Sequence, residues 1–169
     1  MYSGTQFQLM AEYNQWMNGK IYGICAQIPD EQRNQDMGAF FKSIHATLDH
    51  ILWGDRALWG RLAEQPIAST TIGELLYPDF DALWAARQEM DNTLLKWTAG
   101  LEPEWLQSPR TYTSFVDGKT RTVPQWSMVC HIFNHQTHHR GQVTTLMYQL
   151  GYDPGITDMP WTPALNQEA

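Results

Sequence analysis

Four long stretches of this chain repeat their apolar residues every three or four positions, which is the period of an α-helix that buries one face. We expect helices at residues 5–28, 43–64, 80–99 and 124–150. Ser43 and Asp79 suit the N-caps of the second and third helices, and Pro29 follows the first. Residues 65–78 form one long connection. The pattern predicts a single all-α domain, residues 1–169, folded as a four-helix bundle.

A small β-hairpin is expected just before the last helix. Residues 111–123 are rich in β-branched side chains and are interrupted by Asp117 and Gly118. This dipeptide tolerates the positive φ angles of a type I′ turn. Because so short a hairpin is marginal by itself, we expect it to rest on the helices.

The amino-acid composition of the chain limits the partners and surroundings that we expect for it. The net charge is -7 and no basic patch is visible, so we expect no nucleic-acid binding. No run approaches the roughly 18 apolar residues of a membrane span, and the N-terminus does not read as a signal peptide. Cys25 and Cys130 both lie in apolar helical patterns and are expected to be buried, which fits a reducing cytoplasm rather than a disulfide framework.

Four of the six histidines lie close together in the predicted last helix, at positions 131, 135, 138 and 139. A rotation of about 100° per residue places His139 in the apolar stripe and His135 at its edge. The same rotation turns His131 and His138 toward solvent or a helix flank. His135 and His139 are spaced i, i+4, so their rings lie one above the other and could share a metal ion.

Two ligands hold a metal weakly, and a third should come from another helix. The candidates are His45 and His50, both in the second helix. His50 lies beside Gly54 and Ala57, whose small side chains would let a neighbouring helix approach closely, and His45 lies on the opposite flank. The alternative is that these histidines are hydrogen-bonded core residues with no metal.

Three polar residues are further candidates for the site. Asp55 falls within the apolar stripe of its helix, where a carboxylate needs a partner. It could form a salt bridge or cap the hairpin, or it could support a ligand or act as a general base. Gln142 lies nearly over His135 and could orient a ligand or a substrate. Arg140 points elsewhere and could pair with Asp55 or with an acidic residue of a partner chain.

Three segments of the chain together resemble the DinB (DNA-damage-inducible) family, also called DinB/YfiT-like. They are EYNQWMN at residues 12–18, SIHATLDHILWGDRALW at residues 43–59 and NHQTHHRGQ at residues 134–142. The resemblance covers nearly the whole chain. It implies that the ligand positions of the family are His50, His135 and His139, with the acidic position at Asp55.

The resemblance also implies an up-down-down-up four-helix bundle and a divalent-metal site of nickel, zinc or iron, often in a homodimer. Broader relatives include thiol-dependent S-transferases and a mycothiol-dependent maleylpyruvate isomerase. Despite the family name, nothing in the chain points to DNA.

Three hypotheses of function follow. Three neutral histidines with an open position are typical of a catalytic metal, which predicts a thiol-dependent S-transferase that acts on a small electrophile with a low-molecular-weight thiol. The second is a stress-response or binding module with a structural metal. The third is a metal-dependent hydrolase with Asp55 or Gln142 near a water.

Overall fold

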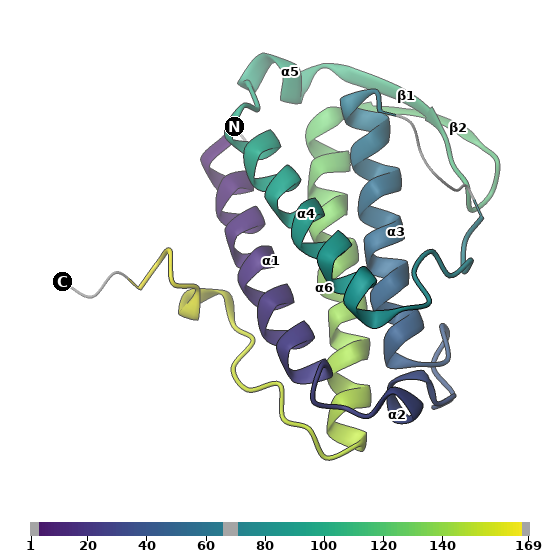
Figure 1. The fold of residues 1–169 in the computed structure, drawn as a ribbon. Helices are drawn as coiled ribbons and strands as arrows, with labels where there is room; N and C mark the ends of the chain where they lie inside the picture. The colour runs from purple at the N-terminus through teal and green to yellow at the C-terminus, as the bar shows by residue number, and fades with distance from the viewer. Residues whose placement is uncertain (1–3, 66–70, 167–169) are drawn as a thin grey trace.

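The structure is a computed structural model that describes residues 4–65 and 71–166, and most of it is helical (Figure 1). The four long helices are α1 (Gly4–Cys25), α3 (Ile44–Ala63), α4 (Phe80–Ala99) and α6 (Gln125–Gln149). They confirm the four predicted helices. The first ends at Cys25 rather than at residue 28. The long connection predicted at residues 65–78 lies partly outside the described residues, because 66–70 are not described.

The four helices form an up-down-down-up bundle. Figure 1 shows α1 and α6 running in one direction and α3 and α4 in the other. The closest packing is between antiparallel partners, α1 with α4 and α3 with α6. The predicted fold class is therefore confirmed, and the α3–α6 contact brings together the two helices that carry the histidines.

Local sequence signals fix where α3 and α4 begin. The Ser43 side chain accepts a hydrogen bond from the backbone N–H of Ala46 at 3.1 Å, and Asp79 does the same for Ala82 at 2.8 Å. Both predicted N-caps are confirmed. Two further helices, α2 (Asp30–Asn34) and α5 (Pro103–Gln107), were not predicted. Five residues make little more than one turn, which is too short to show a helical period.

The β-hairpin is confirmed, but its predicted turn is wrong. Strands β1 (Pro109–Thr113) and β2 (Thr120–Pro124) pair antiparallel, and the pairing ends at Thr113 and Thr120. Residues 114–119 therefore form a longer loop, in which Gly118 has φ +66°. Asp117 does not take a positive φ. Its side chain instead accepts a hydrogen bond from the N–H of Lys119 at 3.2 Å, an interaction that favours a loop over a two-residue turn.

The hairpin lies across the end of the bundle and along α3 (Figure 1). Arg110 of β1 donates from Nε to the carbonyl of Arg61 at 3.1 Å and from Nη1 to the Glu64 carboxylate at 2.9 Å. A cation is favourable here because the last carbonyls of a helix lack partners within it. The hairpin is thus attached to the C-terminal end of α3.

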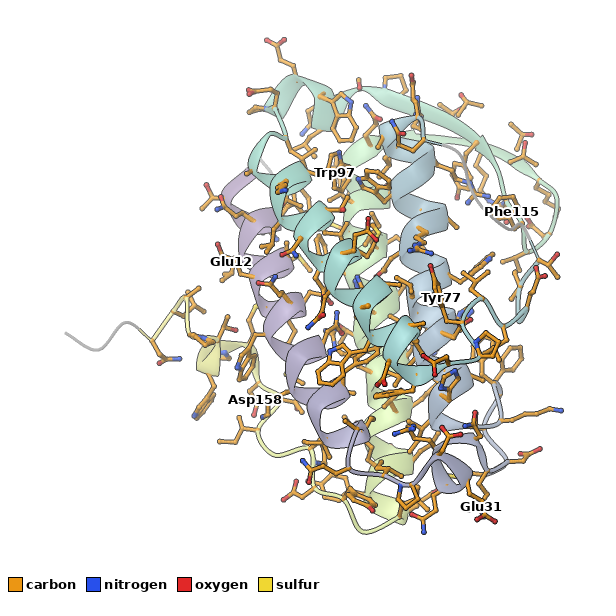
Figure 2. The ribbon with its side chains drawn as sticks, in the orientation of Figure 1. Glu12, Glu31, Tyr77, Trp97, Phe115 and Asp158 are labelled. Carbon is orange, nitrogen blue, oxygen red and sulfur yellow. The ribbon has the colours of Figure 1, made fainter. Side chains whose placement is uncertain are left out.

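Apolar side chains fill the space between the four long helices, whereas Glu31 and Asp158 lie on the outside (Figure 2). The largest fully buried apolar side chains include Tyr22, Phe7 and Met17 of α1. Within the described part of the chain, no helix is long and apolar enough to cross a membrane.

A buried polar network interrupts this core halfway along the bundle. Every long helix contributes to it: Asn14 and Asn18 from α1, Asp55 from α3, Arg87 and Asp91 from α4, and Gln136 and Arg140 from α6. Arg87 pairs with Asp55 and, at 2.9 Å, with Asp91. The two arginines balance the two aspartates, so the network buries no net charge.

Candidate metal centre

Three histidines from two helices come together where α3 packs on α6. They are His50 of α3 and His135 and His139 of α6, and one ring nitrogen from each lies within 4.8 Å of the other two. These are the three residues singled out from the sequence. The antiparallel packing of α3 and α6 is what brings them to one place, and together they could hold a metal ion.

The spacing of the ring nitrogens fits a metal ion. The Nε2 atoms of His50 and His135 are 3.2 Å apart. Two nitrogens bound to one zinc at about 2.0–2.1 Å with tetrahedral angles would lie roughly 3.3 Å apart. The two imidazoles thus already have the separation that a shared ion requires.

The His135 ring occupies space that only a glycine on α3 can leave. A Cβ atom added to Gly54 would lie 2.3 Å from Cε1 of His135, far inside contact distance. Gly54, which was predicted to allow close approach of a neighbouring helix, therefore makes room for the imidazole of the candidate ligand His135.

The His50 ring is held by aromatic stacking. It lies against Phe41, with ring centroids 3.8 Å apart and planes at 21°, and against Trp53, with centroids 5.6 Å apart and planes at 18°. Its Nδ1 is buried and has no hydrogen-bond partner among the described residues. Contact with these two rings orients the imidazole, whose Nε2 faces His135 of α6.

Gln142 orients His139. The Oε1 atom of Gln142 lies 2.8 Å from Nδ1 of His139, one turn earlier on α6. Because a carbonyl oxygen only accepts, Nδ1 carries the proton and Nε2 keeps its lone pair. Gln142 therefore stabilises the tautomer that can bind a metal through Nε2.

All three histidines are uncharged at neutral pH. Burial, helped by the neighbouring His139, lowers the pKa of His50 to about 4. Burial and the nearby histidines lower the pKa of His135 to about 3, and burial also lowers the pKa of His139. Neutral imidazoles offer their lone pairs to a metal without first losing a proton.

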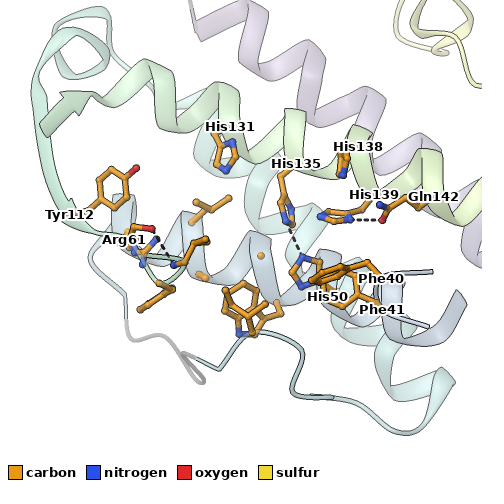
Figure 3. Close-up of a pocket in the computed structure, with 18 residues that line it drawn as sticks. Phe40, Phe41, His50, Arg61, Tyr112, His131, His135, His138, His139 and Gln142 are labelled. Carbon is orange, nitrogen blue, oxygen red and sulfur yellow. Dashed lines mark hydrogen bonds between the residues drawn. The ribbon is translucent and has the colours of Figure 1, made fainter. Parts of the chain in front are cut away.

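The three histidines lie toward one end of a pocket of about 510 Å³, with His50 on α3 opposite His135 and His139 on α6 (Figure 3). The rest of the lining comes from α3, α6, the hairpin, Ile72 and residues 40–41. His131 and His138 are exposed and line the same pocket, but they are not part of the three-histidine cluster. His45 is elsewhere, with Nε2 2.7 Å from the carbonyl oxygen of Tyr77.

Asp55 lies outside the pocket. Its carboxylate is fully buried, pairs with Arg87 and accepts a hydrogen bond from Nε2 of Gln136 at 2.7 Å. Burial raises its pKa to about 6, and the Arg87 charge opposes that rise, so Asp55 is ionised at neutral pH. Of the roles considered for Asp55, a salt bridge is the one found in the structure.

Arg140 belongs to the same buried network. It donates to the side-chain oxygen of Asn14 and, at 3.1 Å, to Oε1 of Gln136. It forms no direct ion pair with Asp55 among the described contacts. The sequence did hold a signal for this network, because Asn14–Asn18, Arg87–Asp91 and Gln136–Arg140 are all spaced i, i+4 on one helix face.

The two cysteines differ in burial. Cys25 is buried in the core, as expected, but Cys130 is only partly buried, so the prediction for Cys130 was wrong. A rotation of about 100° from the buried Val129 carries Cys130 to the edge of the apolar face of α6. Neither cysteine is among the described residues that line the pocket.

Phe41 and Arg61 are among the pocket residues that were not singled out from the sequence. Phe41 precedes α3 and has no periodic pattern to mark it. Arg61 follows His50 by eleven residues, about three helical turns, which places both on one face of α3. That spacing was a usable signal.

Fold and site together define a helical bundle with a three-histidine cluster that could hold a metal ion. The model of the DinB family matches residues 1–169, and the chain therefore belongs to the DinB family.

Individual relatives agree with this assignment. The chain is 27% identical over 164 residues to protein DinB of Bacillus subtilis strain 168, and the match covers 87% of each chain. The crystal structure of a DinB-like protein from Bacillus cereus is similar in fold, with a TM-score of 0.64 and 17% identity. That match covers 83% of this chain and 90% of the other.

Proposed function

We propose that this chain is a metal-dependent enzyme that transfers a low-molecular-weight thiol onto a small electrophile. The observation that carries the proposal is the convergence of three neutral imidazoles on one side of a pocket large enough for a small molecule. Three protein ligands leave a coordination position for a ligand that enters through the pocket.

A divalent metal held by His50, His135 and His139 would lower the pKa of a bound thiol and so favour its thiolate. The side chains of the pocket would orient the ligands and exclude water. Phe41 and Trp53 hold the His50 ring and, as apolar walls, keep water from the sulfur. The thiol proton would leave to solvent, the sulfur would form a bond to an electrophilic carbon, and the leaving group would depart with its electron pair.

The pocket favours a nucleophile that comes from outside the chain. Its described lining contains no cysteine, aspartate or glutamate. The hydrolase hypothesis placed Asp55 or Gln142 beside the attacking water, and Asp55 is instead paired with Arg87 in the bundle core. Gln142 cannot act as a base. The thiol transferase is therefore the better supported of the two catalytic hypotheses.

The test is a rate measurement with metal-loaded protein, several low-molecular-weight thiols and a chromogenic electrophile. We expect a metal-dependent rate above the uncatalysed background. His139→Ala should lose both bound metal and rate, whereas His138→Ala, a change at the adjacent exposed histidine, should keep both. A rate no higher than background with every thiol would contradict the proposal.

The metal content of protein purified without a nickel column would identify the native ion among nickel, zinc and iron. It would also test the cluster directly. We expect about one ion per chain, and none after His139→Ala.

The alternative is a binding or stress-response module in which the metal holds the fold together. In our proposal the fold does not depend on the metal, because the apolar core and the polar network connect all four helices without it. Metal at about 100 times its Kd would then add about 2.7 kcal/mol, or roughly 5–10 °C in Tm. Loss of cooperative unfolding on metal removal would favour the structural role.

A further inference from the structure

The pocket has a second polar end, formed by Arg61. Figure 3 shows Arg61 and Tyr112 at one end of the pocket and the three histidines toward the other. The chain has 18 acidic residues and a net charge of -7, yet none of the described lining residues is acidic. Because no acidic side chain of the described lining balances the charge of Arg61, an anionic group of a ligand could do so.

Arg61 is held in place but not neutralised. Its guanidinium lies over the Phe115 ring, 3.8 Å from the centroid, and Nη2 donates to the carbonyl of Thr113 at 3.0 Å. Among the described residues, no carboxylate lies within ion-pair distance of Arg61. Nε and Nη1 make no hydrogen bond with the described residues, so donors of the planar guanidinium remain available.

The two ends are set apart by α3. His50, Gly54, Ala57 and Arg61 follow one another at intervals of three or four residues along the same face. Eleven residues at about 1.5 Å each separate the backbones of His50 and Arg61 by roughly 16 Å. Both side chains lean toward the N-terminus of α3, but the Arg61 side chain is the longer of the two, so we place its guanidinium roughly 10–15 Å from the histidines.

The lining between the two ends is mostly apolar and aromatic, and it includes Trp53, Leu58 and Phe115. His131 and Ser114 are polar residues of the same lining. An elongated ligand could therefore lie along α3 with its uncharged middle against the apolar side chains. Its two ends would meet the charged Arg61 and the histidine cluster.

We propose that Arg61 binds the carboxylate of the ligand that this pocket accepts. Together with the function proposed above, on which the sulfur end rests, the ligand class is a thiol with a carboxylate roughly 10–15 Å from its sulfur. The fork of donors on a guanidinium matches the two oxygens of a carboxylate, and such charge-assisted pairs are the strong ones.

The test uses straight-chain mercaptocarboxylic acids of increasing length, from mercaptopropionate to mercaptoundecanoate, and mercaptoalkanols of the same lengths. Cobalt-loaded protein reports contact between sulfur and metal by its charge-transfer absorption. We expect both series to give this absorption. The acids whose length matches the pocket should bind about ten- to a hundredfold more tightly than the alkanols.

Arg61→Gln should remove the preference for the acids and leave the affinity for the alkanols unchanged, which also shows that the pocket is intact. Arg121→Gln, at a surface ion pair of the same hairpin, should leave the preference as it is. Equal binding of acids and alkanols at every length would overturn the anionic subsite while the function proposed above would stand.

A failure of the proposed function can also be distinguished from a failure of the Arg61 subsite. If no thiol gives the absorption, the proposed function fails, and calorimetry with straight-chain monocarboxylates against alcohols of the same length then tests Arg61 alone. A preference for the monocarboxylates that Arg61→Gln removes would support the subsite. No such preference would overturn it.

Discussion

At the scale of single residues, the three candidate ligands owe their positions to three different kinds of contact. Aromatic stacking orients His50, a missing side chain at Gly54 makes room for His135, and a hydrogen bond from His139 to Gln142 selects a tautomer. None of these supporting groups would itself bind the metal. Their loss should therefore weaken metal binding without unfolding the bundle.

Gly54 offers the sharpest test of this statement. Gly54→Ala should weaken metal affinity roughly 10–100-fold, the loss typical of removing a group that orients a ligand, because the new Cβ displaces the His135 ring. Metal affinity is measured by competition with a chromogenic chelator. Gly23→Ala is the matched control, since its added Cβ meets nothing within 4 Å. Unchanged affinity in Gly54→Ala would show that the ring can move at no cost.

Metal binding should tolerate mild acid. Protons compete with the metal for imidazole nitrogen, and they compete only near and below the pKa of the ring. Since burial lowers the pKa of His50 to about 4, that of His135 to about 3 and that of His139 below its ordinary value, metal affinity should fall much less between about pH 7 and 6 than it would with ordinary histidines. Histidines with the ordinary pKa of about 6.5 would already lose affinity there. A fall in affinity between about pH 7 and 6 as steep as that of ordinary histidines would contradict the lowered pKa values.

Sequence periodicity was sufficient for the two candidate ligands of α6, whereas the choice of His50 over His45 also used the family resemblance. The inward positions of His135 and His139 follow from the helical period alone, because they depend on one helix. The partner of Asp55 could not be found in the same way. Arg87 lies on another helix, and only the packing of α3 with α4 brings the two charges together.

At the scale of elements, the long helices were predictable and the short or loop-dependent ones were not. Four helices repeat their apolar residues often enough to be recognised, whereas α2 and α5 do not. The hairpin strands were found, but the turn was assigned to the wrong class. The Asp117 side chain hydrogen-bonds within the loop, and a local dipeptide pattern does not show this.

The hairpin should loosen when its attachment to α3 is removed. Arg110→Ala deletes the hydrogen bonds to the Arg61 carbonyl and the Glu64 carboxylate, at a cost of about 1 kcal/mol. We expect hydrogen exchange of the β1 and β2 amides to become roughly fivefold faster, with metal affinity unchanged. Arg121→Ala is the control, because Arg121 pairs with Asp117 inside the hairpin. Equal acceleration in both variants would show that the Arg110 contact does not hold the hairpin.

At the scale of the whole molecule, the bundle separates its two polar regions. The candidate metal centre opens into a pocket between α3, α6 and the hairpin, and the charged network lies buried among all four helices. Asp55 and Gln136 are on the same two helices as the histidines but belong to the network. Stability and chemistry can therefore be altered independently.

Asp55→Ala tests this separation. Removing the carboxylate leaves Arg87 with Asp91 as its remaining acidic partner and deprives Gln136 of an acceptor, and breaking a buried ion pair costs about 3–5 kcal/mol. Chemical denaturation should show that loss, while the folded fraction still binds one metal per chain with unchanged affinity, because Asp55 does not line the pocket. Asp117→Ala, at an exposed pair, should change stability far less. If Asp55→Ala instead lost metal at unchanged stability, Asp55 would belong to the metal centre and the two polar regions would be one.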